Sequence, residues 1–263
     1  MDLGLKGKKA LVCGGSKGLG YATAEALARE GAQVFILGRD EAALKAACAR
    51  IKSVAELEPI SASCDLLSAE ARKELVGRIN SNWGGIDILI HNVGGPKAST
   101  VEETSNEAWE EGFQRLFMTA ADLNQAFVPG MKERKWGRVV TITSLSVMEP
   151  IAMLSISNAM RSASTALSKT LADEVAKFGV TVNCVAPGLV QTDRTEELIE
   201  ARMKKSGQTR EQHETEMFKN IPAGRLGNPA EFGAVVCFLC SEQAAYITGS
   251  TICVDGGKRR STY

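Results

Sequence analysis

The chain lacks several features that would assign it to whole classes of protein. Its 31 Lys and Arg residues balance 31 Asp and Glu residues, so no net charge attracts nucleic acid or an anionic membrane. No uninterrupted apolar stretch approaches the ~20 residues of a membrane helix, and residues 1–9 lack the apolar core of a secretion signal. We therefore expect a cytoplasmic protein with no nucleic-acid or membrane partner.

The seven cysteines form no disulfide or metal pattern. An odd number scattered from Cys13 to Cys253 is typical of reduced thiols. Cys237 and Cys240 are closely spaced, but they lie in an apolar stretch with no second pair and no neighbouring His. We predict that this pair packs in the core and that the chain has no metal site.

Apolar runs alternate with amphipathic segments along all 263 residues, which is enough chain for one α/β domain spanning residues 1–263. The patterns predict strands at residues 9–13, 32–37, 57–63, 86–90, 138–143, 180–185 and 250–254. They predict helices at 21–30, 40–54, 69–82, 109–127 and 155–178, the fourth ending before Pro129. Repeated right-handed crossovers then predict an α/β fold of Rossmann type, with a doubly wound, seven-stranded parallel sheet.

A glycine-rich turn joins the first predicted strand to the first predicted helix. It reads Gly14-Gly15-Ser16-Lys17-Gly18-Leu19-Gly20. Glycines let the backbone approach a pyrophosphate, and the helix N-terminus offers that anion unpaired N–H groups. The motif alone also fits a tight turn in any α/β protein. The flanking sequence is therefore needed to distinguish a dinucleotide-binding turn from an ordinary one.

The end of the second predicted strand bears on the choice of dinucleotide. An acidic residue there binds the ribose 2′-hydroxyl of NAD(H), whereas an Arg accommodates the 2′-phosphate of NADP(H). The strand ends at Gly38 and Arg39, and Lys17 adds positive charge, which favours NADP(H). Asp40, one residue later, instead favours NAD(H). We favour NADP(H) over NAD(H), because a guanidinium fits a phosphate with two hydrogen bonds.

One segment breaks the alternation of strands and helices. Residues 191–220 are rich in Glu, Lys and Arg and poor in apolar residues. Long excursions of this kind are usually lids or surface loops. Because this one leaves the carboxyl end of a strand, where doubly wound sheets bind ligands, we predict a helical lid, with an inert surface loop as the alternative.

Further motifs between residues 7 and 257 resemble the short-chain dehydrogenase/reductase family, and within it the 3-oxoacyl-acyl-carrier-protein reductases. They are Gly14-x3-Gly18-x-Gly20, Cys64-Asp65, Asn92-Val93-Gly94, 182–188 (Val-Asn-Cys-Val-Ala-Pro-Gly), Thr192 and 254–257 (Val-Asp-Gly-Gly). The resemblance implies a homotetramer. It also implies cofactor contacts at Gly14, Ser16, Lys17, Gly18, Leu19, Gly20, Arg39, Asp65, Leu66, Asn92, Gly94, Arg161, Pro187, Gly188 and Thr192.

The resemblance fails at the positions that carry the family's chemistry. That chemistry normally uses Asn, Ser, Tyr and Lys, with Tyr as the proton donor or acceptor. The same register places Leu116, Ser144, Ser157 and Arg161 at these positions, with Ser146 as a near alternative to Ser144. The three tyrosines, Tyr21, Tyr246 and Tyr263, all lie far away in sequence.

An aliphatic hydroxyl is a far weaker acid than a phenol, and an arginine cannot relay a proton. We therefore expect an NADPH-dependent carbonyl reductase or alcohol dehydrogenase that works through Ser144, Ser157 and Arg161, with water as the proton source. Its substrate is a small-molecule carbonyl or alcohol, and an apolar wall suggests an acyl group: Met148, Met153, Leu154 and Ile156. Core packing explains that wall about equally well.

Two other interpretations stay open. The chain could be an NADP(H)-binding protein without turnover, acting as a sensor or as a partner subunit. It could also use the same pocket as a lyase or isomerase. His91 is predicted to be a core histidine, and Glu149 is either a solvated loop carboxylate or an acid near the substrate.

Overall fold

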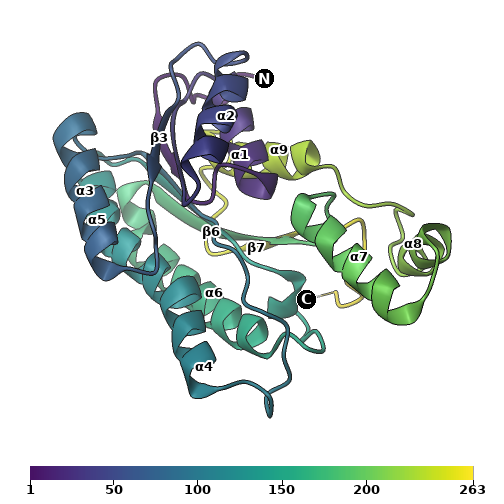
Figure 1. The fold of residues 1–263 in the computed structure, drawn as a ribbon. Helices are drawn as coiled ribbons and strands as arrows, with labels where there is room; N and C mark the ends of the chain where they lie inside the picture. The colour runs from purple at the N-terminus through teal and green to yellow at the C-terminus, as the bar shows by residue number, and fades with distance from the viewer. Residues whose placement is uncertain (263) are drawn as a thin grey trace.

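Seven parallel strands form one sheet in the order β3-β2-β1-β4-β5-β6-β7 (Figure 1). This computed structural model describes residues 1–262, apart from the side chains of residues 198, 201, 202 and 205, so Tyr263 lies outside it. The strands are β1 (Lys9–Val12), β2 (Gln33–Gly38), β3 (Ile60–Ser63), β4 (Ile88–His91), β5 (Gly137–Ile142), β6 (Val180–Pro187) and β7 (Thr251–Val254). The predicted fold class is confirmed.

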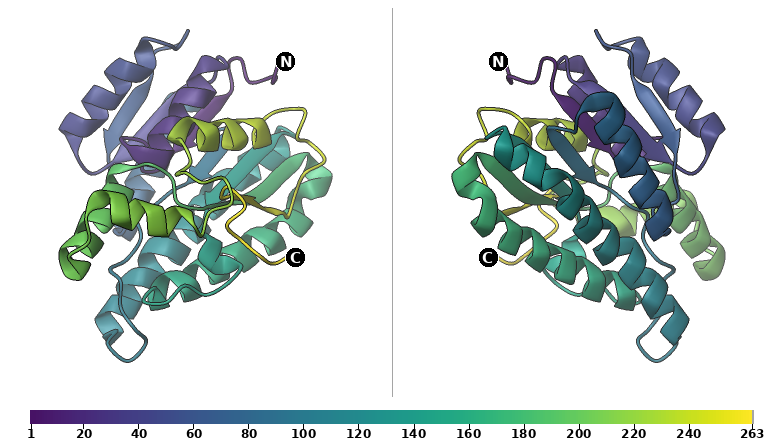
Figure 2. Two further views of the ribbon diagram at one scale, coloured as in Figure 1. Left: turned by 90° about the vertical axis from the view of Figure 1, so that its right-hand side faces the viewer. Right: turned by 90° about the vertical axis from the view of Figure 1, so that its left-hand side faces the viewer.

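Helices cover both faces of the sheet (Figure 2). One face carries α1 (Gly18–Arg29), α2 (Glu41–Lys52) and α9 (Pro229–Leu239). The other face carries α3 (Ala69–Trp83), α5 (Thr119–Glu133) and α6 (Ser155–Val175), which η3 (Ala176–Phe178) follows. Both faces of the sheet are therefore buried, as its continuous apolar strands predict.

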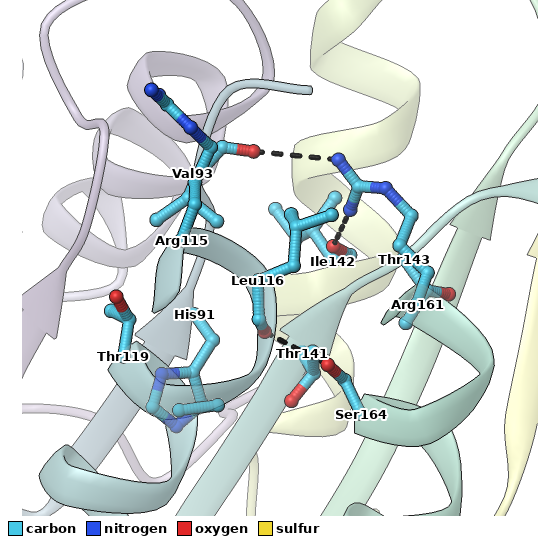
Figure 3. A pocket seen from close by; sticks show the side chains of 11 residues that line it. His91, Val93, Arg115, Leu116, Thr119, Thr141, Ile142, Thr143, Arg161 and Ser164 are labelled. Carbon is cyan, nitrogen blue, oxygen red and sulfur yellow. Dashed lines mark hydrogen bonds between the residues drawn. The ribbon is translucent and has the colours of Figure 1, made fainter. Parts of the chain in front are cut away.

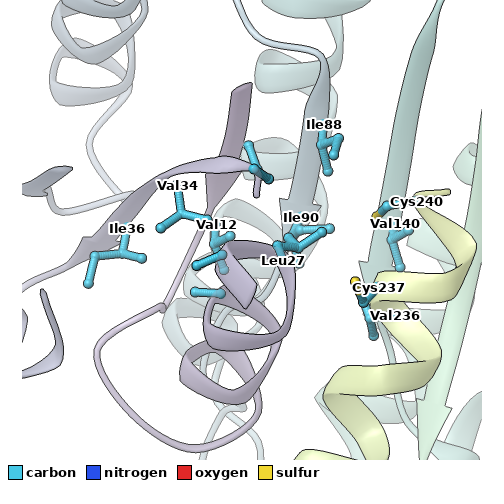
Figure 4. Packing of buried hydrophobic residues seen from close by; sticks show 14 of the residues in the cluster. Val12, Leu27, Val34, Ile36, Ile88, Ile90, Val140, Val236, Cys237 and Cys240 are labelled. Carbon is cyan, nitrogen blue, oxygen red and sulfur yellow. The ribbon is translucent and has the colours of Figure 1, made fainter. Parts of the chain in front are cut away.

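Alternating residues of β1, β2, β4, β5 and β6 enter two separate cores. Along β1, Ala10 and Val12 join the core beneath α1, α2 and α9, whereas Leu11 joins the core beneath α3, α5 and α6. Figure 4 shows part of the first core, which includes Cys237 and Cys240. Burial raises the pKa of the Cys237 thiol to about 12, and burial also raises the pKa of the Cys240 thiol well above its usual value. The prediction that this pair packs in the core is confirmed.

The helix predicted at 109–127 differs most from the structure. It begins earlier, as α4 (Asn106–Phe113), widens into a π-helical turn η1 (Gln114–Met118) and continues as α5 through Pro129. The expected end before Pro129 is therefore wrong. Pro129 and Gln125, four residues before it, are both exposed, so water can bond the carbonyl that the proline leaves unpaired. Phe127, Val128 and Met131 are buried and hold the helix to the sheet.

The excursion at 191–220 contains two helices, α7 (Asp193–Ser206) and α8 (Arg210–Phe218). Thr192 caps α7, and Thr209 forms a capping box at α8. Arg210 of α8 pairs with Glu196 of α7, so the two helices are tied together. They project beside the body of the protein in Figure 1. Closure of this unit over a substrate stays a prediction. None of the described helices is long and apolar enough to cross a membrane.

Candidate functional site

The glycine-rich loop lies where β1, β2 and β4 end. The Gly15 N–H donates to the Leu37 carbonyl at 2.8 Å, and the Asn92 Nδ2 donates to the Gly14 carbonyl at 3.2 Å. Lys17 is the N-cap of α1, and its side chain makes no capping hydrogen bond. The first turn of α1 therefore has backbone N–H groups without a side-chain acceptor, which suits an anion.

Two glycines show how tightly this loop is built. Gly18 has φ +58°, which L side chains rarely adopt. A Cβ on Gly20 would lie 2.1 Å from the Gly14 carbonyl oxygen, so α1 can pack this close to the loop only with glycine there. The cradle thus has the backbone shape and the free donors that the diphosphate of a dinucleotide requires.

The end of β2 brings positive charge to the same edge. Arg39 and Lys17 are exposed, and in the described part of the chain neither has a carboxylate within ion-pairing distance. The Ser16 Oγ lies 3.2 Å from the position that a Cβ on Gly38 would take, so the loop and the end of β2 are neighbours. The Asp40 side chain caps α2, because its Oδ1 accepts the Ala43 N–H at 3.0 Å.

The other predicted cofactor residues follow strand ends along this edge. Asp65 and Leu66 follow β3, and Asn92 and Gly94 follow β4. Pro187 ends β6, and Gly188 follows it. Thr192 reaches the glycine-rich loop, since a Cβ on Gly18 would lie 3.7 Å from its Cγ2. Leu19 belongs to the first turn of α1. The structure therefore brings these residues to one edge of the sheet.

Arg161 lies on α6 and is held between the ends of β4 and β5. Its Nη1 donates to the Ile142 carbonyl at 2.9 Å and its Nη2 to the Val93 carbonyl at 3.4 Å (Figure 3). Its Nε donates to the Ser157 Oγ at 3.3 Å, one helical turn earlier. Burial lowers the pKa of the Arg161 guanidinium to about 10, so the side chain stays charged at neutral pH. The sequence does not reveal these two carbonyls, although Ile142 ends β5 and Val93 follows β4 at the binding edge.

Ser144 immediately precedes η2 (Leu145–Val147), the short helix after β5, and α6 packs against that helix. The Ser144 Oγ accepts the Ser146 N–H at 3.1 Å, which leaves its own O–H free to donate to a ligand. Ser146 is 3% exposed, and its Oγ is buried without a partner among the described residues. The half-buried Ser144 is thus the more accessible of the two candidate serines.

Leu116 lies in the π-helical turn and is buried. Its carbonyl accepts the Ser164 hydroxyl at 2.8 Å. Beside it lies a cavity of about 20 Å³, large enough for about one water molecule. Residues of β4, β5, η1, α5 and α6 line the cavity, among them His91, Leu116, Thr143, Arg161 and Ser164 (Figure 3).

His91 is 5% exposed, so the prediction that it is a core histidine is confirmed. Its Nε2 lies 2.9 Å from the Asn124 Oδ1, a partner that the sequence did not reveal. Burial lowers the pKa of the His91 imidazole to about 4, and its Nδ1 is buried without a partner in the described part of the chain. Glu149 is exposed, as expected of a loop carboxylate.

The described tyrosines lie outside this arrangement. Tyr21 belongs to α1 and packs under the Arg50 guanidinium, 4.0 Å from its ring centroid. Tyr246 is fully exposed in the segment before β7. Neither lines the cavity beside Arg161. The side chains gathered around Ser157 and Arg161 therefore include hydroxyls and a guanidinium, but neither of these phenols.

Comparisons with known proteins agree with this geometry. Residues 14–259 match the family described as enoyl-(acyl carrier protein) reductase. The chain is 34% identical to human dehydrogenase/reductase SDR family member 4 over 254 residues, which cover 96% of this chain and 88% of that protein. It is 32% identical to the 3-oxoacyl-[acyl-carrier-protein] reductase FabG of Vibrio cholerae, over 97% of this chain and 98% of that protein.

A solved structure is similar over the full length. It is L-sorbose reductase from Gluconobacter frateurii complexed with NADPH and L-sorbose. The TM-score is 0.94 at 32% identity, with 99% of this chain and 100% of that chain covered. The likeness therefore extends over both the cofactor edge and the surroundings of Arg161.

Proposed function

The chain belongs to the short-chain dehydrogenase/reductase family, and we propose that it interconverts a small carbonyl compound and its alcohol with NADP(H) as the redox partner. One observation carries the choice of cofactor. Arg39, after the end of β2, and Lys17, in the glycine-rich loop, have no ion-pair partners in the described structure, while Asp40 caps α2. The similar sorbose reductase was solved with NADPH, which supports the same choice.

NADPH would supply a hydride, and residues of this chain would bind and orient the NADPH molecule. The glycine-rich loop and the first turn of α1 would hold the diphosphate, and Arg39 with Lys17 the 2′-phosphate. Asp65, Leu66, Asn92, Gly94, Arg161, Pro187, Gly188 and Thr192 would complete the cofactor contacts that the family resemblance implies.

We further propose that Ser157 and Arg161 stand where the family's Tyr and Lys normally lie, and Leu116 where its Asn lies. Ser144 and Ser157 would then donate hydrogen bonds to the substrate oxygen, Arg161 would stabilise the negative charge that develops there, and water would supply the proton. Loss of a positioned acid costs a factor of about 10²–10⁴ in rate, whereas orientation contributes about 7–11 kcal/mol. Hydride transfer should therefore be slower than with a Tyr, but not abolished.

A second candidate is an NADP(H)-binding protein without turnover, acting as a sensor or as a partner subunit. The observation that favours it is the location of Tyr21 and Tyr246, both outside the arrangement around Arg161. Such a protein would keep the complete cofactor edge and respond to NADPH binding without consuming it.

The family resemblance also underlies our proposals for assembly and substrate. We propose a homotetramer in the cytoplasm and a small carbonyl or alcohol substrate that can carry an acyl group. Sedimentation equilibrium of the purified chain tests the assembly, and a mass other than four chains would contradict it.

A turnover assay distinguishes the enzyme from the binding protein without turnover. NADPH oxidation would be followed with a panel of ketones, oxo acids, oxoacyl thioesters and quinones, for the natural chain and for the double variant Ser157→Tyr/Arg161→Lys. The enzyme proposal predicts measurable oxidation by the natural chain with at least one substrate class. NADPH binding without turnover by the natural chain, together with turnover by the double variant, would favour the second candidate instead.

A further inference from the structure

Arg161 is a half-buried cation whose hydrogen-bond partners in the described structure are all neutral. Its guanidinium has five N–H donors, and three of them bind the Ser157 hydroxyl and the carbonyls of Ile142 and Val93. Two N–H groups therefore remain for other partners. Within the described residues, no Asp or Glu carboxylate comes within ion-pairing distance of this guanidinium.

Two other arginines show what a completed environment looks like in this protein. Arg72 is 3% exposed and pairs with the Asp122 Oδ2 through both Nε, at 2.8 Å, and Nη2, at 2.6 Å. Arg138 is 2% exposed; it binds three carbonyls and stacks 4.4 Å from the Trp136 ring centroid. Among the described residues, neither a carboxylate nor an aromatic ring contacts the Arg161 guanidinium, so its environment is less complete.

The guanidinium of Arg161 can be reached from the binding edge. A Cβ on the exposed Gly95 would lie 3.8 Å from its Nη2, and no other atom would lie within 4 Å of that Cβ. On another side is the small cavity beside Leu116. A ligand at this edge of the sheet can therefore approach the charged end of Arg161 past Gly95.

The neighbouring hydroxyl adds a second donor. The Ser157 Oγ accepts the Arg161 Nε–H, and in the described structure Ser157 donates its own proton to no protein group. A hydroxyl that accepts a charged hydrogen bond becomes a better donor to a ligand. The Ser157 O–H and the Arg161 N–H groups lie side by side on α6, so a ligand with oxygens on adjacent carbons can bind both.

We propose that the substrate of this site is a 2-oxo carboxylic acid, or the matching 2-hydroxy acid, whose carboxylate pairs with Arg161. Its keto oxygen lies at the hydroxyls of Ser157 and Ser144. This inference rests on the proposed function, because the keto carbon must accept a hydride from NADPH. The electron pair of the C=O π bond moves to the oxygen, which takes a proton from water. The products are the 2-hydroxy acid and NADP⁺.

The test compares 2-oxohexanoate with its neutral amide, 2-oxohexanamide. Dissociation constants are measured by the change in fluorescence of NADPH bound to the natural chain, and kcat/KM by NADPH oxidation. A charged hydrogen bond to a carboxylate predicts about a 10- to 100-fold preference for the acid. The variant Arg161→Gln should bring this ratio close to one, and Arg161→Lys should keep a preference for the acid.

Arg115→Gln is the matched control, because Arg115 lines the same cavity but already pairs with Glu111. Its ratio of acid to amide should stay that of the natural chain. Circular dichroism shows whether Arg161→Gln folds. If it does not, the acid-to-amide ratios of the natural chain and of Arg161→Lys still test the inference.

The failure of this inference can be told apart from failure of the proposed function. Absence of NADPH binding would remove the proposed function itself. NADPH binding with equal affinity for acid and amide, or with no binding of either, overturns the carboxylate inference alone. A preference for the acid that survives in Arg161→Gln overturns it as well.

Discussion

The proposed cofactor side and the proposed substrate side of the binding edge differ in the groups that supply their charges and hydrogen bonds. On the cofactor side, rigid backbone supplies the site: Gly18 in a left-handed conformation, Gly20 against the Gly14 carbonyl, and the uncapped first turn of α1. On the substrate side, Ser144, Ser157 and Arg161 supply side-chain donors but no phenol. If these two proposed assignments hold, the comparison predicts that variants can change cofactor binding and chemistry separately.

The largest expected effect is on the substrate side. Ser144→Ala should lower kcat/KM by about 10²–10³, because it removes one preorganised donor to the substrate oxygen. Its NADPH dissociation constant should stay unchanged. Steady-state kinetics and a fluorescence titration measure the two quantities, with Ser146→Ala as the control. A larger loss of activity in Ser146→Ala would assign the role to Ser146 instead.

The next effect is on the cofactor side. In Gly20→Ala, the new Cβ would lie 2.1 Å from the Gly14 carbonyl oxygen, so the loop must move. Strain of about 1–3 kcal/mol should weaken NADPH binding by roughly 10- to 100-fold. Gly77→Ala is the control, because Gly77 lies on the exposed face of α3 with open space around it. That variant should bind NADPH normally and gain about 0.5–1 kcal/mol in stability.

His91, at the boundary of the two sides, gives a pH-dependent test. Its pKa is lowered to about 4 in the folded chain, so the unfolded chain binds more protons below pH ~6.5. Stability from the neutral imidazole is complete above the unfolded pKa and is lost as the pH falls towards the folded pKa. Between pH 7 and pH 5, protonation of His91 should lower the free energy of unfolding by about 2 kcal/mol.

Urea unfolding of the natural chain and of His91→Asn at the two pH values measures this contribution. The variant should lose about 2 kcal/mol less than the natural chain. Identical losses in both proteins would mean that His91 does not titrate in this way.

The smallest effect concerns the choice of cofactor. Arg39→Ala should weaken NADPH binding by about tenfold and leave NADH binding unchanged, because only NADPH has a 2′-phosphate for the guanidinium. Arg78→Ala, an exposed arginine on α3, is the control. Equal loss of affinity for both dinucleotides would contradict the 2′-phosphate assignment.

The two sides also differ in how well the sequence predicts them. The positions of the strands and the glycine-rich loop follow from local patterns, since apolar runs and glycine spacing are encoded by neighbouring residues. The parallel, doubly wound sheet follows from the repeated crossovers. The π-helical turn at Gln114–Met118 and the passage of α5 through Pro129 depend on packing against the sheet, which no local pattern contains. The role of Asp40 as the N-cap of α2 is predictable from the sequence, because Asp is a preferred residue at the start of a helix.

The contacts around Arg161 were harder to foresee. Ser157 and Arg161 are one helical turn apart, so their contact is local in sequence. The Val93 carbonyl instead comes from the segment after β4, 68 residues away. His91 and Asn124 are 33 residues apart and meet only because β4 and α5 pack together. Such contacts follow from the tertiary fold, so the sequence predicts the residues of the site better than their partners.

Titration of the natural chain with NADPH and, separately, with NADH tests the central claim most directly. The account predicts saturable binding of one NADPH per chain, with an affinity at least about tenfold higher than for NADH. Absence of saturable NADPH binding by a folded chain would contradict it.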